Sequence, residues 1–145
     1  PMIYLLDTCV VSELVARQPN PNVVDWIDSI EEDKLFLSAI TIGEIKKGIE
    51  KLADTERKRA LAGWLEEDLL TRFRDRMLPI DTAVMLVWGR LASDLEKQGR
   101  PMPAIDSLIA ATCLNGELGL VTRNENDFAR SKVDSINPWN GTRPA

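Results

Sequence analysis

Residues 3–13 read IYLLDTCVVSE, a run of four apolar residues that ends directly at an aspartate. A short, unbroken apolar run is typical of a strand buried on both faces, as in a parallel sheet covered by helices. The small and apolar residues after Asp7 predict that the chain turns straight into a helix. Asp7 is therefore expected to stand where the first strand leaves the core.

The rest of the 145-residue chain alternates short apolar runs with amphipathic segments. Further strands are predicted at 35–38, 77–80, 119–122 and 135–137. Helices are predicted after a break at PNPN (19–22), over 23–30, 41–54, 55–73, 84–95 and 105–114, with Gly99 placed to stop the helix at 84–95. Strands that alternate with helices of this length indicate an α/β fold of three layers, α/β/α, with a central, mostly parallel sheet of four to five strands. We predict a single domain over residues 1–145.

The sequence contains no histidine, which removes the usual general acid and base near neutral pH. Proton or metal chemistry in this chain must therefore rest on carboxylates. The two cysteines, Cys9 and Cys113, lie far apart and match neither a zinc site nor a disulfide framework. The net charge of −5 argues against broad electrostatic attraction to nucleic acid, although it leaves a local basic patch open.

No apolar run approaches the roughly 18 residues needed to span a bilayer. The first residues also lack a basic region ahead of a short apolar segment, as a secretion signal would have. We therefore expect a cytoplasmic protein that does not enter a membrane.

Four acidic residues are predicted to meet at one edge of the sheet. Asp7 ends the first strand, and Glu44 lies in the first turn of the helix after the second. Asp106 opens the helix before the fourth strand, and Asp127 follows that strand. In such sheets ligands bind outside the carboxyl ends of the strands, where the chain order reverses. Like charges about 4 Å apart repel by several kcal/mol unless a cation neutralises them. Oxygen ligands without histidine or paired thiolates favour Mg²⁺ or Mn²⁺ over zinc or copper.

Each acid also has a purely structural interpretation. Asp7 fits a helix N-cap, which stabilises a helix by about 1 kcal/mol. Glu44 follows Thr41 by three residues and completes the T-x-x-E pattern of a capping box. Asp106 suits the positive end of a helix macrodipole. Asp81, in IDTAV, resembles Asp7 locally and is predicted only to cap its helix, which makes it a control. The functional hypothesis therefore depends on the joint placement of the acids.

The basic residues form clusters that are typical of a solvated face. They include Lys46 and Lys47, the run RKR at 57–59, and Arg72, Arg74 and Arg76. Arg123 differs, because it follows the fourth strand beside the predicted site. A guanidinium at that place can contact a phosphate through two parallel hydrogen bonds.

Three segments carry these acids: LLDTCVVSEL (5–14), LSAITIGEIKKGI (37–49) and PAIDSLIAATCLNGELGLVTRNENDF (103–128). In this order they resemble the PIN-domain nucleases, in particular bacterial toxins of the VapC and FitB type. The resemblance implies a PIN-like fold and a metal-dependent ribonuclease in which Asp7, Glu44 and Asp106 hold magnesium or manganese. It also implies a homodimer that is neutralised by a cognate antitoxin of the VapB or FitA type.

The chain departs from the family pattern at two positions. The first motif of the family is usually Asp-Thr-Asn; Thr8 matches it, but Cys9 replaces the asparagine. Many members also carry a fourth acid where this chain has Asn124. Either Asp127 supplies that acid, or Asn124 positions a water or the substrate.

The reaction expected from these residues is hydrolysis of an RNA phosphodiester by a metal-activated water that attacks in line. Asp7 and Asp106 are expected to be the main ligands. Glu44 would complete the coordination directly or through water, and can accept the proton of the attacking water. The identity of the RNA does not follow from the sequence, because RNA recognition often depends on loop shape and splayed bases.

Two other functions fit part of the pattern. A phosphatase that forms an aspartyl-phosphate also has a strand followed by an aspartate, but it normally needs a second aspartate where Cys9 stands. A non-catalytic module could use this fold to bind nucleic acid or a protein, and its acids would then be helix caps.

The helices at 42–53 and 55–73 either form a groove for an antitoxin segment or pack only on their own sheet.

Overall fold

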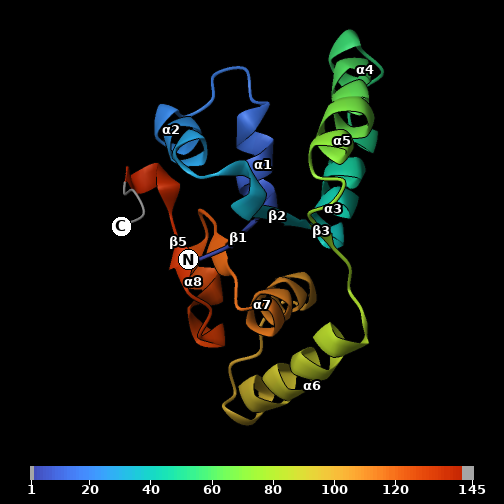
Figure 1. Ribbon diagram of the computed structural model, residues 1–145. Helices are drawn as coiled ribbons and strands as arrows, with labels where there is room; N and C mark the ends of the chain where they lie inside the picture. Colours follow the sequence, from blue (N-terminus) through green and yellow to red (C-terminus); the bar gives the residue numbers. More distant parts are fainter. Residues whose placement is uncertain (1, 142–145) are drawn as a thin grey trace.

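The computed structural model describes residues 2–141 (Figure 1). Its sheet is entirely parallel, with the strand order β3-β2-β1-β4-β5. The strands are β1 (Tyr4–Leu6), β2 (Leu35–Ser38), β3 (Met77–Leu78), β4 (Gly119–Val121) and β5 (Ser135–Ile136). Each lies at a predicted place, and the predicted fold class is confirmed. The predicted domain also included residues 1 and 142–145, which lie outside the described residues.

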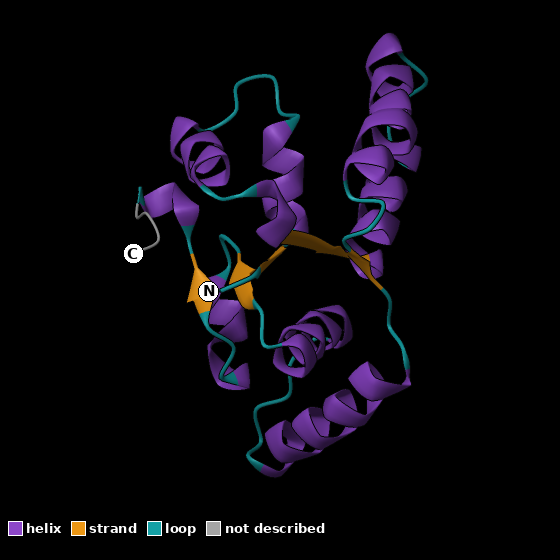
Figure 2. Ribbon diagram, in the orientation of Figure 1, coloured by secondary structure: helices purple, strands orange, loops and turns teal. Residues whose placement is uncertain are grey.

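Helices cover both faces of the sheet, as Figure 2 shows. On one side lie α1 (Thr8–Leu14), α2 (Pro21–Ser29), α3 (Ala39–Glu50), α4 (Glu56–Gly63), the π-helix η2 (Trp64–Leu69) and α5 (Leu70–Arg72). On the other lie α6 (Thr82–Lys97), α7 (Ala104–Gly116) and α8 (Glu125–Phe128). Three short 3₁₀ turns complete the elements: η1 (Glu32–Lys34), η3 (Ala129–Ser131) and η4 (Pro138–Asn140). None of the helices in the described part of the chain is both long and apolar enough to cross a membrane.

The strands are apolar on both faces because each face belongs to a different core. In β1, Tyr4 and Leu6 pack into the cluster under α1 and α2, whereas Leu5 packs into the cluster under α7 and α8. Tyr4 meets the buried ring of Trp26 edge to face, at 5.1 Å between ring centroids. Phe128 closes the second core from α8. The unbroken run at residues 3–6 thus reflects burial from two sides.

The start of α3 differs from the prediction. The helix begins at Ala39, two residues before Thr41, because the hydroxyl of Ser38 at the end of β2 accepts a hydrogen bond from the backbone N–H of Ile40. Glu44 therefore lies in the second turn of α3, not in the first. Thr41 is an interior residue of the helix, so the predicted capping box is wrong.

Other helix ends agree with the sequence signals. Asp81 caps α6 by accepting a hydrogen bond from the N–H of Val84 at 3.0 Å, as its role as a control requires. Gly99 adopts a positive φ of 68° just after α6, and the N–H of Arg100 then bonds to the carbonyl of Leu95. A glycine takes up this left-handed conformation without a steric penalty.

Glu32 is held by two arginines where α5 meets the start of β2. Arg72 donates two hydrogen bonds of 2.8 Å to its carboxylate and Arg76 donates one. The bonds from Arg72 contribute most to lowering the pKa of Glu32, which falls from 4.5 to about 2. A group with a lowered pKa stabilises the fold above its unfolded pKa, and this contribution is lost as the pH falls through the folded value.

We therefore expect Glu32→Gln to reduce the free energy of unfolding in a pH-dependent way. The loss at neutral pH should be only about 1 kcal/mol, because the side chain is 49% exposed and solvent weakens the interaction. It should shrink as the pH falls from 4.5 towards 2. Urea unfolding of parent and variant over a series of pH values measures this difference. An equal loss at every pH would show that the carboxylate charge is not responsible.

Candidate active site

Asp7 lies at the carboxyl end of β1, at the point where the strand order reverses between β2 and β4. Its side chain is buried; Oδ1 accepts a hydrogen bond from the N–H of Thr8 and Oδ2 accepts one from the hydroxyl of Thr122, both at 2.8 Å. Burial raises the pKa of Asp7 despite these two bonds, and the negative charge of Glu44 raises it further. Asp7 therefore caps α1 and also presents a carboxylate in an environment that disfavours its charge.

Glu44 is joined to this site by Thr8. The hydroxyl of Thr8 donates to Oε1 of Glu44 over 2.6 Å and lies 3.0 Å from the hydroxyl of Thr41. Thr41 is buried, so the hydroxyl contact sits in the packed junction of α1 and α3. Because α3 starts at Ala39, capping does not explain Glu44. The orientation of its carboxylate is instead set by the hydrogen bond from Thr8 of the neighbouring helix α1.

Asp106 and Asp127 approach from the other face of the sheet. Asp106 is the third residue of α7 and is half-buried. Burial raises the pKa of Asp106 most, followed by the charges of Asp7, Asp127 and Glu44. Asp106 is thus close enough to the other three acids for their charges to act on it, and Asp7 is close enough to Glu44. No three acidic or cysteine side chains of residues 2–141 lie close enough, as they stand, to hold one metal ion.

Cys9 takes part in the same hydrogen-bond network. Its thiol donates to Oδ2 of Asp7 over 3.8 Å and lies 3.7 Å from the hydroxyl of Thr122. The N–H of Arg123 donates to its sulfur at 3.5 Å. Burial raises the pKa of the thiol, so Cys9 serves as a neutral, weak donor. The loss of asparagine at this position therefore does not leave Asp7 without a neighbour on that side.

The loop after β4 holds three residues of interest. The N–H of Asn124 donates to the hydroxyl of Thr122 at 3.0 Å, and its carbonyl accepts from the N–H of Asp127 at 2.9 Å. The backbone of Asn124 thereby begins α8 and places Asp127 in its first turn. The guanidinium of Arg123 lies over the ring of Trp139, 5.3 Å from its centroid. Within the described residues it forms no ion pair with the four acids.

Thr122 is the residue of this site that sequence reasoning missed. It is fully buried and supplies the strong side-chain hydrogen bond to Asp7. Its position directly after β4, on the same sheet edge as Asp7, was the available signal.

We expect Thr122→Val to lower the free energy of unfolding by about 1–3 kcal/mol, because it leaves a buried carboxylate oxygen without that donor. Urea unfolding measures the loss.

The matched control is Thr122→Ser, which keeps the hydroxyl and should recover most of the stability. A valine variant as stable as the parent would show that Asp7 Oδ2 does not depend on this bond.

A groove of about 270 Å³ opens beside Glu44, next to the helices at 42–53 and 55–73 for which a groove was one of two alternatives. It lies between α1, α3 and α4 with the start of η2, and its lining residues include Thr8, Glu44, Ile49, Leu52, Leu61 and Trp64. Its walls are mainly apolar, and one end reaches the acidic site.

The arrangement suits a hard divalent cation in its chemistry. Every candidate ligand is a carboxylate oxygen, the type that Mg²⁺ and Mn²⁺ prefer. The raised pKa values of Asp7 and Asp106 record the repulsion and burial that a bound cation would offset.

Comparison with known proteins agrees with this geometry. The model of the PIN domain family matches residues 4–133. The toxin FitB of Neisseria gonorrhoeae is 37% identical over 137 residues, which cover 94% of this chain and 99% of that protein. The VapC ribonuclease Y4jK of Sinorhizobium fredii is 32% identical over 137 residues, covering 94% and 98%.

A solved structure shows the same fold. The crystal structure of FitAcB from Neisseria gonorrhoeae superposes with a TM-score of 0.89 at 36% identity, covering 94% of this chain and 99% of that one. The family resemblance drawn from the three acidic motifs is thereby confirmed. This chain belongs to the PIN-domain family.

Proposed function

We propose that this protein is a ribonuclease that acts as the toxin of a toxin–antitoxin pair, and that it hydrolyses RNA with the help of Mg²⁺ or Mn²⁺. The observation that carries the proposal is the meeting of four carboxylates at the carboxyl edge of the sheet, where three of them act on the pKa of Asp106. Relatives named as a toxin and as a VapC ribonuclease support it.

In this proposal Asp7 and Asp106 hold the cation, and Glu44 joins them directly or through water. When bound, the cation supplies an activated water and stabilises charge on the scissile phosphate. Thr122 and the N–H of Thr8 fix the Asp7 carboxylate. The Thr8 hydroxyl fixes Glu44, whose carboxylate can take the proton of the attacking water.

Three further residues have supporting roles in the proposal. Asp127 serves as the fourth acid, because its charge already acts on Asp106. Asn124 begins the helix that carries Asp127 and lies exposed beside it, where its side chain can position a water or the substrate. Arg123 is exposed on the same loop and can hold an RNA phosphate from the rim of the site while its guanidinium packs on Trp139.

The proposed protein partner is a cognate antitoxin. The mainly apolar groove between α1, α3 and α4 offers a place for one of its helical or extended segments. A segment seated there would reach Glu44 and so block the site. Solved structures of relatives from toxin–antitoxin systems support an antitoxin as the kind of partner.

We also propose a homodimer that works in the cytoplasm. On α6, Leu86 is 74% exposed and Met85 is 40% exposed; on α7, Leu114 is exposed as well. Exposed apolar side chains on two adjacent helices are typical of an interface between subunits.

The proposal is tested by incubating the purified, partner-free protein with total RNA in Mg²⁺, in Mn²⁺ and in EDTA. Denaturing gels should show discrete cleavage products with either metal and none in EDTA. Binding of RNA without cleavage under all three conditions would overturn the proposal in favour of a non-catalytic module. That alternative also has to explain why Glu44, which caps no helix, is held beside Asp7.

A further inference from the structure

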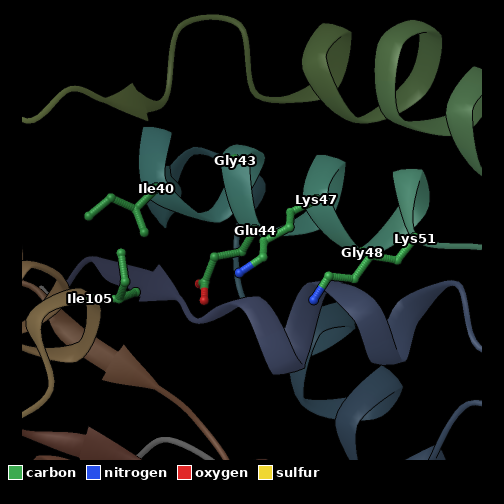
Figure 3. Close-up of a pocket in the computed structure, with 7 residues that line it drawn as sticks. All are labelled: Ile40, Gly43, Glu44, Lys47, Gly48, Lys51 and Ile105. Atoms are coloured by element: carbon green, nitrogen blue, oxygen red, sulfur yellow. The ribbon is translucent and has the colours of Figure 1, made fainter.

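A second groove, of about 500 Å³, runs along α3 on the side of Glu44 away from the apolar groove. Its lining residues are Ile40, Gly43, Glu44, Lys47, Gly48, Lys51 and, from α7, Ile105. Figure 3 shows the side chains of Glu44, Lys47 and Lys51 extending from α3 to the same side. The groove therefore runs from Ile40 and Ile105 past a carboxylate of the candidate active site to two lysines.

The two lysines carry charge that the described part of the chain does not neutralise. Both are exposed, and neither forms an ion pair within residues 2–141. The adjacent Lys46, in contrast, pairs with Glu50 at 2.9 Å. Lys47 and Lys51 stand four residues apart, where like charges destabilise a helix. The fold alone thus gives no reason for this pair.

The glycines of the groove have no packing role in the chain either. A Cβ added at Gly43 or Gly48 would meet no atom within 4 Å. Glycine inside a helix is less favourable than alanine because it loses more backbone freedom on folding. Both positions lie in the interior of α3 and line the groove. Their effect is to leave the helix backbone open to close approach from outside.

We propose that this groove binds the RNA strand next to the scissile bond, with Lys47 and Lys51 contacting neighbouring phosphates. The inference rests on the proposed ribonuclease function. Along a helix axis these lysines are about 6 Å apart, a spacing that suits successive phosphates of an extended strand. Ile40 and Ile105 form an apolar end at which a base or ribose can rest.

RNA explains the features of the groove better than a protein segment does. Two unpaired ammonium groups complement a polyanion, and a chain with a net charge of −5 needs such a local patch to hold one. The mainly apolar groove on the other side of Glu44 already offers a site for a protein segment. Both grooves reach Glu44, but two exposed lysines without ion pairs line this one, whereas the basic residue that lines the other, Arg57, donates to the carbonyl of Val15.

The test compares RNA binding by the parent, by Lys47→Ala/Lys51→Ala, and by Lys46→Ala as the matched control on the same helix. The probe is a fluorescent single-stranded oligoribonucleotide, followed by anisotropy in EDTA so that binding is measured apart from cleavage. We expect the double variant to bind about tenfold more weakly at low salt, with a salt slope smaller by about 1.4 for two lost phosphate contacts. The control should bind like the parent.

An unchanged affinity and salt slope in the double variant would overturn the inference and leave the groove to a protein partner. Cleavage of total RNA by the same three proteins reports separately on the proposed function. If the parent cuts RNA and the double variant cuts it equally well, the groove assignment is wrong and the ribonuclease stands. If the parent binds the probe through the lysines but never cuts RNA, the proposed ribonuclease fails and the groove is an RNA-binding surface with no scissile bond beside it.

Gly48→Ala tests whether the ligand approaches the exposed backbone of α3 at Gly48, and it does so without removing a charge. The variant should melt at a higher temperature than the parent, as expected for alanine in a helix, and yet bind the probe more weakly. A higher melting temperature with unchanged binding would show that the ligand does not approach the helix backbone there, and would overturn that part of the inference.

Discussion

Asp7→Asn is expected to lower the rate of RNA cleavage by at least about 10³-fold, because it removes the charge of the most buried carboxylate of the site. The fold should survive, since asparagine also serves as an N-cap and its oxygen can still accept from the N–H of Thr8. Single-turnover cleavage of an RNA substrate in saturating Mg²⁺, together with thermal unfolding of the same preparation, measures both effects.

Asp81→Asn is the matched control for this prediction. Asp81 also follows a strand and caps the next helix, but it lies away from the four acids. The control should cleave RNA at the rate of the parent. If Asp7→Asn kept more than about a tenth of the activity, Asp7 would be a helix cap rather than a metal ligand.

The sequence was sufficient to predict the convergence of the acids because parallel topology decides it. Once residues 3–6 are recognised as a doubly buried strand, Asp7 must leave the sheet at its carboxyl edge. Glu44, Asp106 and Asp127 are each tied to the same edge by a neighbouring strand or helix. In the structure, the negative charges of the other three acids raise the pKa of Asp106. No side-chain detail was needed for this step.

The start of α3 could not be decided from the sequence because two cap residues compete there. Ser38 and Thr41 both precede helix-forming residues, and only Thr41 is followed by a glutamate at the capping-box spacing. The structure uses Ser38, because β2 ends there and the turn into the helix is immediate. Thr41 instead lies against Thr8 of the neighbouring helix. Such a contact depends on how two helices pack, which a local pattern does not contain.

The pattern of basic residues predicts a solvated face for Lys46 and Lys47 alike, and so does not indicate the groove lined by Lys47 and Lys51. The residues four positions further along the helix nevertheless differ. Lys46 faces Glu50, an ion pair that favours a helix, whereas Lys47 faces Lys51, a repulsive pair. That contrast was present in the sequence. The glycines at 43 and 48 gave a second signal, but only the structure shows that nothing inside the chain fills the space beside them.

Saturation with Mg²⁺ or Mn²⁺ is expected to stabilise the parent strongly. A cation at about 100 times its Kd adds about 2.7 kcal/mol to the free energy of unfolding. For a chain of this length that corresponds to a rise in Tm of about 5–10 °C. The rise should be much smaller in Asp7→Asn and in Asp106→Asn, because each lacks one of the two proposed direct ligands. Differential scanning calorimetry over a metal titration measures all three proteins.

With metal the parent should have a higher Tm than the variants, and without metal Asp106→Asn should have the higher Tm. This reversal distinguishes a metal site from a set of helix caps. The pKa of both aspartates is raised in the folded chain, so the metal-free parent loses stability as the pH rises from 3.8 through their folded values. At neutral pH, Asp106→Asn should therefore melt above the metal-free parent. If metal leaves the Tm of the parent unchanged and both variants melt below it, Asp7 acts as a helix cap and Asp106 as a favourable charge in the first turn of α7, and the carboxylates meet at this edge without holding a cation.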